Sequence, residues 1–362
     1  MSHDFLAPDF SVIVDGVPLP MRAEAVIGLL EVVHEPDTLD HFALVFANDF
    51  PDLRWTHSGD TLFKEGGAVE ISLGYVDALE PVFSGEITGV TAEFPERGTP
   101  SIRVVGHTRM HRLQGSLKTK TFLDVTDAQV AQTVGKAAGL TVRADPTPTR
   151  HPYLIQYNQT DLDFLLDRAR RIHFEVIVDD KTLFFRKAND SAQKVTTLVW
   201  GDPQSVSLRN KIFPLRSFTT TLSTLRQVSR VTVRSLDPMT REPIVGQAAT
   251  GSEVSMMGGT TSGPSIARSA FGDVEDTVVT PPAASREEAD QLAKAIYNDR
   301  ALRFVSGRGT AVGAPALRAG TVTELRGLGS RFDGLYYVTE STQRFGDNGY
   351  ETTFSVRRNA VG

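Results

Sequence analysis

The hydrophobic residues of the first hundred positions occur in short runs in which apolar and polar side chains alternate. In the run from Val69 to Leu73, every second side chain is apolar, and this alternation predicts a strand with one buried face. Glycines interrupt the runs at short intervals, which is typical of antiparallel barrels and sandwiches. We therefore predict an all-β first domain, residues 1–112, with strands at residues 10–14, 27–34, 38–46, 68–75, 80–93 and 101–107.

The apolar positions of residues 113–196 repeat at helical intervals instead. Between Leu162 and Ala169 they recur at i, i+3, i+4 and i+7, which predicts one buried stripe on a helix. Thr160 precedes this stripe, and Asp163 follows three positions later, a variant of the capping box with Asp in place of Glu or Gln. We predict an α/β insert with helices after Thr126 and Thr160, a strand at residues 153–157, and a hairpin of residues 173–178 and 182–187.

The strand pattern returns in residues 197–362. Ser285 and Glu288 form a capping box, which predicts a helix over residues 285–303. Residues 246–284 are rich in Gly, Ser, Thr, Ala and Pro, a composition typical of a long loop, and we expect this arm to become ordered only on assembly. We predict a second β-domain with strands at residues 206–208, 217–222, 227–235, 320–325, 335–344 and 351–358.

These elements together predict a mainly β protein with an α+β insert. The predicted domains are residues 1–112, a first β-barrel; residues 113–196, a small α/β domain; and residues 197–362, a second β-barrel with the long loop 246–284 and the helix 285–303. The pattern of residues alone does not require the two β-domains to be alike.

The composition excludes several classes of site and of location. The chain contains no cysteine, which excludes a disulfide scaffold, a thiolate zinc site, an iron–sulfur cluster and a cysteine nucleophile. The first residues lack a basic segment followed by an apolar one, and nowhere do about 18 apolar residues run together. We therefore expect a protein made and folded in the cytoplasm, without a signal peptide or a membrane span.

The charge is unevenly distributed along the chain. The formal net charge is −6, which does not favour nucleic-acid binding. Residues 1–100 contain 18 acidic and 4 basic side chains, a net charge of −14. Residues 101–362 contain 26 acidic and 34 basic side chains, a net charge of +8. Segments of opposite sign suit oriented docking between copies or against a charged partner, and such docking would weaken in high salt. A solvated acidic face is the alternative.

Two motifs that resemble metal or phosphate sites each fail a requirement. His107 and His111 have the i, i+4 spacing of a helical zinc pair, but no Glu follows His107 and the preceding residues are typical of a strand. Gly135 and Lys136 are not followed by Ser or Thr, so no phosphate-binding loop is predicted. We therefore predict no metal site and no cofactor.

Candidate catalytic groups are explained better by local structure. Residues 259–263 place a serine between glycines without the strand–turn–helix frame of a nucleophile elbow. Residues 327–329 lack the third glycine of a dinucleotide site. Asp161 and Asp163 suit helix capping, and Asp179 and Asp180 suit a hairpin turn. We predict no catalytic residue and a protein that is not an enzyme.

Two blocks of sequence resemble a known family. The segment from Gln156 to Arg171 has a Gln-Tyr pair, two polar residues and Asp-x-x-Phe, and it opens the predicted helix before the hairpin. This segment, residues 317–338 and residues 350–359 resemble the phage late control D and VgrG family. The sequence departs from the family pattern at one position, where the glycine that commonly follows the helix is replaced by His173. The structural residues that carry the resemblance are Gln156, Tyr157, Asp161, Phe164, Arg168, Gly320, Gly327, Gly334 and Tyr337.

The resemblance implies a baseplate hub of a phage-tail-like contractile injection system. Members of this family are homotrimers whose chains hold two similar β-barrels, so that three chains present a ring of six with pseudo-six-fold symmetry. Such a ring is a symmetry adaptor that joins a hexameric inner tube to a trimeric spike. VgrG proteins continue into a further barrel and a β-helical needle, whereas this sequence has no short-period repeat. We therefore expect a separate spike protein, an inner tube protein and other baseplate components as partners.

Three alternatives stay open at this point. The first is the hub of a contractile phage tail virion, which no residue distinguishes from a particle that is released as an injection system. The second is a tail-associated cell-wall hydrolase, which would need an acid/base pair in a cleft. The third is an unrelated β-rich binding protein, which would remain a monomer.

Overall fold

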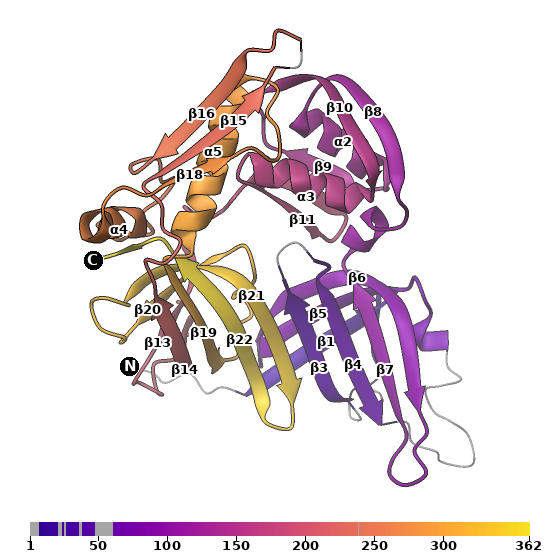
Figure 1. Ribbon diagram of the computed structural model, residues 1–362. Helices are drawn as coiled ribbons and strands as arrows, with labels where there is room; N and C mark the ends of the chain where they lie inside the picture. Colours follow the sequence, from indigo (N-terminus) through magenta and orange to yellow (C-terminus); the bar gives the residue numbers. More distant parts are fainter. Residues whose placement is uncertain (1–6, 21–23, 25–26, 36–37, 48–60, 238) are drawn as a thin grey trace.

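A computed structural model describes residues 7–20, 24, 27–35, 38–47, 61–237 and 239–362 of the chain. About 50% of these residues belong to strands and 17% to helices, which confirms the prediction of a mainly β protein with an α+β insert. In Figure 1 the strands of the first and last parts of the chain lie side by side in the lower half, and the insert lies above them.

The first part of the chain forms strands where the alternation predicts them. Three of the six predicted strands have the expected ends, and the others differ by at most three residues. Their neighbours follow the order β2-β1-β5-β6-β7-β4-β3. The elements are β1 (Pro8–Val14), β2 (Val17–Pro18), β3 (Ile27–His34), β4 (His41–Ala47), the 3-10 helix η2 (Thr61–Phe63), β5 (Ala68–Tyr75), β6 (Ala78–Glu93) and β7 (Ser101–His107).

The last part of the chain contains a closed β-barrel. Its strands follow the order β21-β20-β13-β14-β19-β22, and β22 pairs again with β21 to close the ring. The predicted strand 206–208 is reduced to one isolated bridge between Ser207 and Ile212, because its residues belong to a tight turn that leads into β14. The strands are β13 (Lys194–Val199), β14 (Ile212–Leu222), β19 (Val305–Val312), β20 (Val322–Arg326), β21 (Gly334–Gly346) and β22 (Gly349–Arg358).

One continuous sheet joins the first and last parts. Strand β3 pairs antiparallel with β21, from His34 opposite Ser341 to Leu29 opposite Gly346. Among the described residues this sheet has 13 strands, and one hydrophobic core contains side chains of both parts, such as Phe42 and Phe354. The two predicted β-domains are therefore fused through backbone hydrogen bonds, and their likeness to each other stays a prediction.

The insert has its own core between helices and two small sheets. Thr126 Oγ1 accepts from the Gln129 amide and Thr160 Oγ1 from the Asp163 amide, which confirms both predicted helix starts. Strand β8 escaped prediction because Lys and Thr side chains expose both faces at its start. The elements are η3 (Arg109–Leu113), β8 (Lys118–Thr126), α2 (Asp127–Ala137), β9 (Thr141–Ala144), β10 (Arg150–Gln159), α3 (Asp161–Arg171), β11 (Phe174–Asp179) and β12 (Thr182–Lys187).

The segment expected as a long loop, residues 246–284, carries regular structure. Ser262 caps α4, with Pro264 in its first turn, and β18 pairs parallel with β15. These elements lie beside α5, whose predicted start after Ser285 is confirmed. The composition concealed them because small polar residues make caps and turns as well as loops. The elements are β15 (Arg230–Leu236), β16 (Pro243–Ala249), β17 (Thr261–Ser262), α4 (Gly263–Phe271), β18 (Glu275–Val278), α5 (Arg286–Leu302) and β23 (Ala360–Val361).

Within the described ranges, no helix combines the length and the apolar character needed to cross a membrane.

Candidate functional site

The insert is held against the rest of the chain by three groups of polar side chains. We call them the α5 junction, the β6 junction and the barrel junction, after the element or part that each group contacts. Together they fix the position of the insert relative to the continuous sheet.

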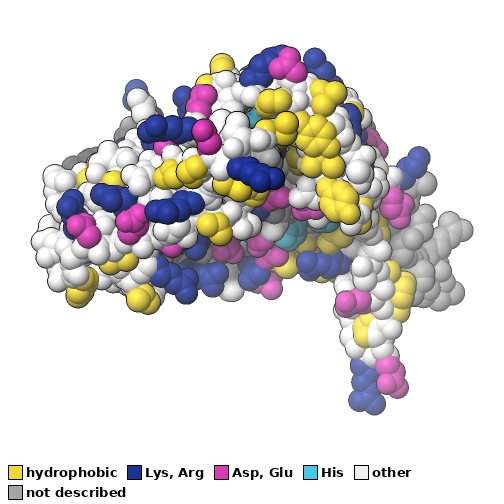
Figure 2. Space-filling view, turned by 45° about the horizontal axis from the view of Figure 1, so that its top comes forward, with side chains coloured by type: hydrophobic (Ala, Val, Ile, Leu, Met, Phe, Trp, Pro, Cys, Tyr) yellow, Lys and Arg dark blue, Asp and Glu magenta, His cyan; other side chains and the backbone are white. Residues whose placement is uncertain are grey.

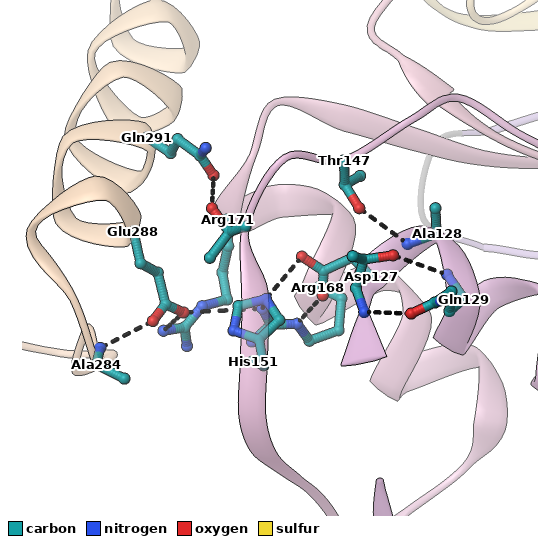
Figure 3. A network of polar contacts seen from close by, with 12 residues as sticks. Asp127, Ala128, Gln129, Thr147, His151, Arg168, Arg171, Ala284, Glu288 and Gln291 are labelled. Carbon is teal, nitrogen blue, oxygen red and sulfur yellow. Dashed lines mark hydrogen bonds and ion pairs between the residues drawn. The ribbon is translucent and has the colours of Figure 1, made fainter. Parts of the chain in front are cut away.

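The α5 junction is centred on Asp127, the first residue of α2. The side chain of Asp127 is 1% exposed. Its Oδ1 accepts a hydrogen bond of 2.5 Å from Arg168 Nε on α3, and its Oδ2 lies 3.2 Å from His151 Nε2, as Figure 3 shows. Burial alone would raise the pKa of Asp127, but the bonds from His151 and Arg168 outweigh it and hold this pKa below its usual range.

The same group of charges reaches helix α5 through Glu288. Glu288 Oε1 accepts from Arg171 Nη2 at 3.0 Å and lies 3.7 Å from Arg168 Nη2. Its other oxygen accepts from the Ala284 amide at 2.8 Å, just before the helix. Arg168 and Arg171 of α3 thus stand between two carboxylates, one on α2 and one on α5 (Figure 3). Each buried carboxylate of the group therefore has an arginine partner, as burial of ions requires.

The β6 junction is centred on Glu86 of strand β6. Its carboxylate accepts from Arg109 Nε at 3.1 Å and from Arg112, and it lies 2.9 Å from His111 Nε2. Arg109 also donates to Asp180 Oδ1, in the turn of the insert hairpin, at 2.5 Å. Burial would raise the pKa of Glu86, but hydrogen bonds from Arg112 and His111 outweigh it and lower this pKa. The carboxylate of Glu86 therefore links strand β6 of the continuous sheet to the insert.

This junction also locates the histidine pair considered in the sequence. His111 lies in the 3-10 helix η3 and contacts Glu86. His107 lies at the end of β7, with its Nδ1 2.7 Å from Thr88 Oγ1. In the described part of the chain, no three potential metal-binding side chains gather at one point.

The barrel junction contains two of the family-motif residues, Gly320 and Tyr337. The hydroxyl of Tyr337 on β21 donates to Glu175 of β11. Glu175 also accepts from the Asn189 amide at 3.0 Å, and Asn189 Nδ2 donates to the Gly320 carbonyl at 3.3 Å. Burial and the charge of Glu175 raise the pKa of Tyr337 well above its usual value. The motif residues here connect the insert hairpin to the barrel.

Three further motif residues lie together inside the insert. Gln156 is fully buried, and its Nε2 donates to Asp161 Oδ1 at 3.0 Å. Asp161 pairs with Lys118 Nζ at 2.5 Å. Phe164 stacks on Phe122, with 5.6 Å between ring centroids. The contacts of these three residues are internal to the insert. Arg168, another motif residue, lies on the same helix as Phe164 and belongs to the α5 junction.

The glycines Gly327 and Gly334 lie in the barrel, where a side chain would not fit. Gly327 has a φ of +86°, and a Cβ there would lie 2.4 Å from the Trp200 carbonyl oxygen. Gly334 has a φ of +133°, and a Cβ would lie 2.8 Å from Nη2 of the buried Arg358. Both positions therefore need glycine for conformation and for space.

The ninth motif residue, Tyr157, belongs to an exposed apolar surface. Leu123 on β8 lies directly opposite Tyr153 on β10, and Ile155 and Tyr157 follow on the same side of the strand. Tyr157 is 70% exposed and Leu123 67%. Figure 2 shows hydrophobic side chains gathered over the insert, in the upper right of the view. We call these four residues the apolar ribbon face, and exposed patches of this kind mark interaction sites.

Sequence reasoning missed the partners of the motif residues. Asp127 and Glu86 received no role, and Glu288 was assigned only to a helix cap, although all three are buried and paired. The position of Asp127 could have been noticed, because an acidic residue in the first turn of a helix is favourable. Its burial could not be predicted from the neighbouring residues. The pairing of Glu288 with α3 joins positions 117 residues apart and has no local signal.

Comparison with known proteins decides the family. The model of the family described as "Alg8 N-terminal domain" matches residues 7–346. The chain belongs to the Alg8 N-terminal domain family. None of the curated proteins matches this family member in sequence.

Solved structures of tail proteins share the fold of this Alg8 N-terminal domain protein. The 43 kDa tail protein of prophage MuSo2 from Shewanella oneidensis has 15% identity and a TM-score of 0.70, over 97% of this chain and 98% of its own. The tail protein from Neisseria meningitidis MC58 has 15% identity and a TM-score of 0.66, over 97% of both chains.

A secretion-system protein has the same fold. The Escherichia coli c3393 protein, described as a component of the type VI secretion system with structural similarity to T4 bacteriophage tail proteins gp27 and gp5, has 13% identity and a TM-score of 0.57, over 96% of this chain and 77% of its own. A chain of the Francisella PdpA-VgrG complex has 9% identity and a TM-score of 0.52, and 58% of it is covered. The fold expected from the VgrG resemblance is therefore confirmed.

Proposed function

We propose that this protein is a structural baseplate hub of a phage-tail-like contractile injection system. In this proposal three copies form a homotrimer with pseudo-six-fold symmetry that joins a hexameric inner tube to a separate trimeric spike and contacts other baseplate components. The observation that carries the proposal is the continuous sheet, in which β3 and β21 join two β-parts in one chain. Three such chains would present six β-parts, which a hexameric ring can match.

The three junctions support a role that depends on fixed geometry. A hub must hold its β-parts at constant angles, and the α5, β6 and barrel junctions tie the insert to both parts through buried charges. A buried ion pair offsets the cost of burial only when its geometry is good and its remaining polar groups have partners, so these contacts favour one arrangement of the parts. The charged clusters described above are all engaged in such contacts, which favours a protein that is not an enzyme.

The distribution of charge favours contacts between copies. The apolar ribbon face is bordered by Lys118, Lys120 and Arg150, whereas residues 1–100 carry a balance of −14, from 18 acidic and 4 basic side chains. In the proposed trimer, the ribbon of one copy faces the acidic first part of the next. This arrangement buries the exposed apolar side chains and sets opposite charges around them.

The hub of a contractile phage tail virion is the second candidate. It is favoured by the similarity to the tail proteins of prophage MuSo2 and of Neisseria meningitidis, because this chain matches both over almost their whole lengths. Both candidates use the same trimeric geometry, so one experiment tests what they share.

The test is the mass of the purified chain by light scattering, alone and with the tube and spike proteins encoded beside it. We expect a trimer, or a monomer that becomes a trimer when a partner is added. If surface charge dominates the contacts, raising the salt concentration will weaken the trimer. A chain that stays monomeric with each partner would overturn the hub proposal.

A further inference from the structure

Two histidines face each other across neighbouring strands of the continuous sheet. His41 begins β4 and His107 ends β7, and the two residues are direct partners in the antiparallel pairing of these strands. Directly opposite residues of such a pair have their side chains on the same face of the sheet, and the two ring centres lie 5.9 Å apart. Both residues are partly exposed. We call them the cross-strand histidine pair.

Each ring of the pair has an oxygen partner at Nδ1. Nδ1 of His41 lies 3.4 Å from the Leu39 carbonyl oxygen, and because a carbonyl can only accept, this nitrogen carries the proton. Nδ1 of His107 lies 2.7 Å from Thr88 Oγ1. Among the described residues, neither Nε2 atom of the pair has a hydrogen-bond partner. The Nε2 atoms are therefore free to act as ligands.

The spacing of the two rings fits a shared metal ion. A histidine nitrogen binds zinc at about 2.0–2.1 Å, so two rings that share one ion have their centres roughly 5–6.5 Å apart. The separation of the cross-strand histidine pair, 5.9 Å, lies in this range. A metal-binding histidine donates its other N–H to an oxygen, which fixes the orientation of the ring. Leu39 and Thr88 supply that oxygen here.

The surroundings leave room for the other ligands of an ion. His41 borders a hollow of about 280 Å³ on the face of the sheet that is turned away from the core. Glu35 also borders this hollow and adds negative charge, whereas Arg344 is paired there with Glu31. Within the described ranges no third potential ligand joins the two histidines. Water can occupy the remaining coordination positions, as it does in open metal sites.

The cross-strand histidine pair differs from the pair that the sequence suggested. His107 and His111 have helical spacing, but Nε2 of His111 lies 2.9 Å from Glu86 and is engaged in the β6 junction. The partner that the fold gives to His107 is instead His41, through the pairing of β4 with β7. Because this pairing joins distant segments, no local spacing could indicate it.

We propose that the cross-strand histidine pair binds one divalent ion of a late transition metal, such as Zn²⁺, Ni²⁺ or Cu²⁺, through its two Nε2 atoms. Imidazole suits these ions, whereas Mg²⁺ and Ca²⁺ prefer oxygen ligands. The bound ion joins β4 to β7 close to the point where the chain enters η3 and the insert. The site belongs to a single chain, so it does not depend on the proposed hub or on its trimer.

Calorimetric titration of the chain with Zn²⁺, without a histidine tag, tests the site. We expect one ion per chain and no binding of Mg²⁺ at this site. Thr88→Val, which removes the partner of His107, should weaken binding by about 10-fold, and His41→Asn or His107→Gln should weaken it more. The matched control is His173→Gln, because Nε2 of His173 lies 3.0 Å from Asp190. This control should bind as the wild type does.

Electron paramagnetic resonance with Cu²⁺ gives a second readout. The wild-type spectrum should show coupling to two nitrogen nuclei, and either histidine variant should lose this signal. Urea unfolding establishes that each variant is folded, and the two positions on different strands guard against one that is not. The proposal is overturned if the wild type binds no Zn²⁺, if both histidine variants bind it as tightly as the wild type, or if His173→Gln loses binding to the same extent.

Discussion

Asp127 and Arg168, which lie 41 positions apart, form an ion pair with 2.5 Å between Oδ1 and Nε in the interior of the insert. Both side chains are almost completely shielded from solvent. Because a charge buried without its partner is costly, each residue depends on the other.

Removal of the Asp127 charge should destabilise the protein strongly. We expect Asp127→Asn to lower the free energy of unfolding by about 3–5 kcal/mol, as is typical when one partner of a buried pair is removed. Urea unfolding measures the loss. The control is Asp124→Asn, which removes the exposed pair with Arg150 and should change little. Equal effects of the two variants would contradict a special role for the buried pair.

The pH dependence of stability should report the same carboxyl group. The pKa of Asp127 is lower in the folded protein than its unfolded value of about 3.9. Its contribution is therefore fully present above that value and is lost as the pH falls through the lower, folded value. We expect Asp127→Asn to flatten the decline of stability in acid, measured by urea unfolding between neutral pH and pH 3 or so. If the stability of wild type and variant declined equally as the pH falls, Asp127 would make no such contribution.

Alanine at Gly327 should be more damaging than alanine at Gly329. Both glycines have positive φ, +86° and +88°, but only at Gly327 does a Cβ meet another backbone atom, the Trp200 carbonyl oxygen. Gly329→Ala should cost roughly 1–2 kcal/mol for conformation alone, and Gly327→Ala should cost more because Trp200 must move. Thermal unfolding of the two variants gives the comparison. Similar melting temperatures would mean that the contact is easily relieved.

Tyr337→Phe should weaken the barrel junction. The lost hydrogen bond joins the phenol to a carboxylate, and such bonds contribute about 1.5–3 kcal/mol. The pKa of Tyr337 is raised in the folded protein, so its contribution is present below the unfolded value of about 10 and is lost as the pH rises further. Urea unfolding near neutral pH should therefore separate wild type from variant more than unfolding in strong alkali. A constant difference would contradict the titration of this group.

The apolar ribbon face should matter for assembly and not for folding. Tyr153 is 56% exposed, so Tyr153→Arg should leave thermal unfolding of the single chain unchanged. In the proposed trimer it adds a charge to a buried apolar contact, and light scattering should detect a loss of trimer. Thr133→Arg, on the exposed side of α2, is the control. A trimer that tolerates Tyr153→Arg would place the contact elsewhere.

Local patterns predicted the elements whose signals are local. The strand β5 contains the alternating run Val69–Leu73, the strands β3 and β7 have the predicted ends, and α2, α3 and α5 begin at the predicted caps Thr126, Thr160 and Ser285. Strand β18 is only four residues long, and its pairing with β15 is what makes it a strand. His173, at the position where the family pattern has a glycine, has a positive φ of +58°, a conformation that glycine adopts at little cost.

Contacts between distant segments had no such signals. Gly320 and Tyr337 were identified through the resemblance. Their partners in the insert, Asn189 for Gly320 and Glu175 for Tyr337, were not identified. The buried Asp127 is polar and lies beside apolar residues in sequence, which makes its burial invisible to periodicity. These positions depend on how three parts of the chain meet in space.

The pairing of β3 with β21 also constrains how the protein can be made. Glu31 and Arg344, which are bonded across these strands, lie 313 positions apart. During synthesis β3 must therefore wait with one edge unpaired until β21 has left the ribosome. Contacts of such long range slow folding, and an unpaired strand edge invites pairing with other chains. The joint that unites the two β-parts is thus also the step at which a nascent chain is most exposed to aggregation.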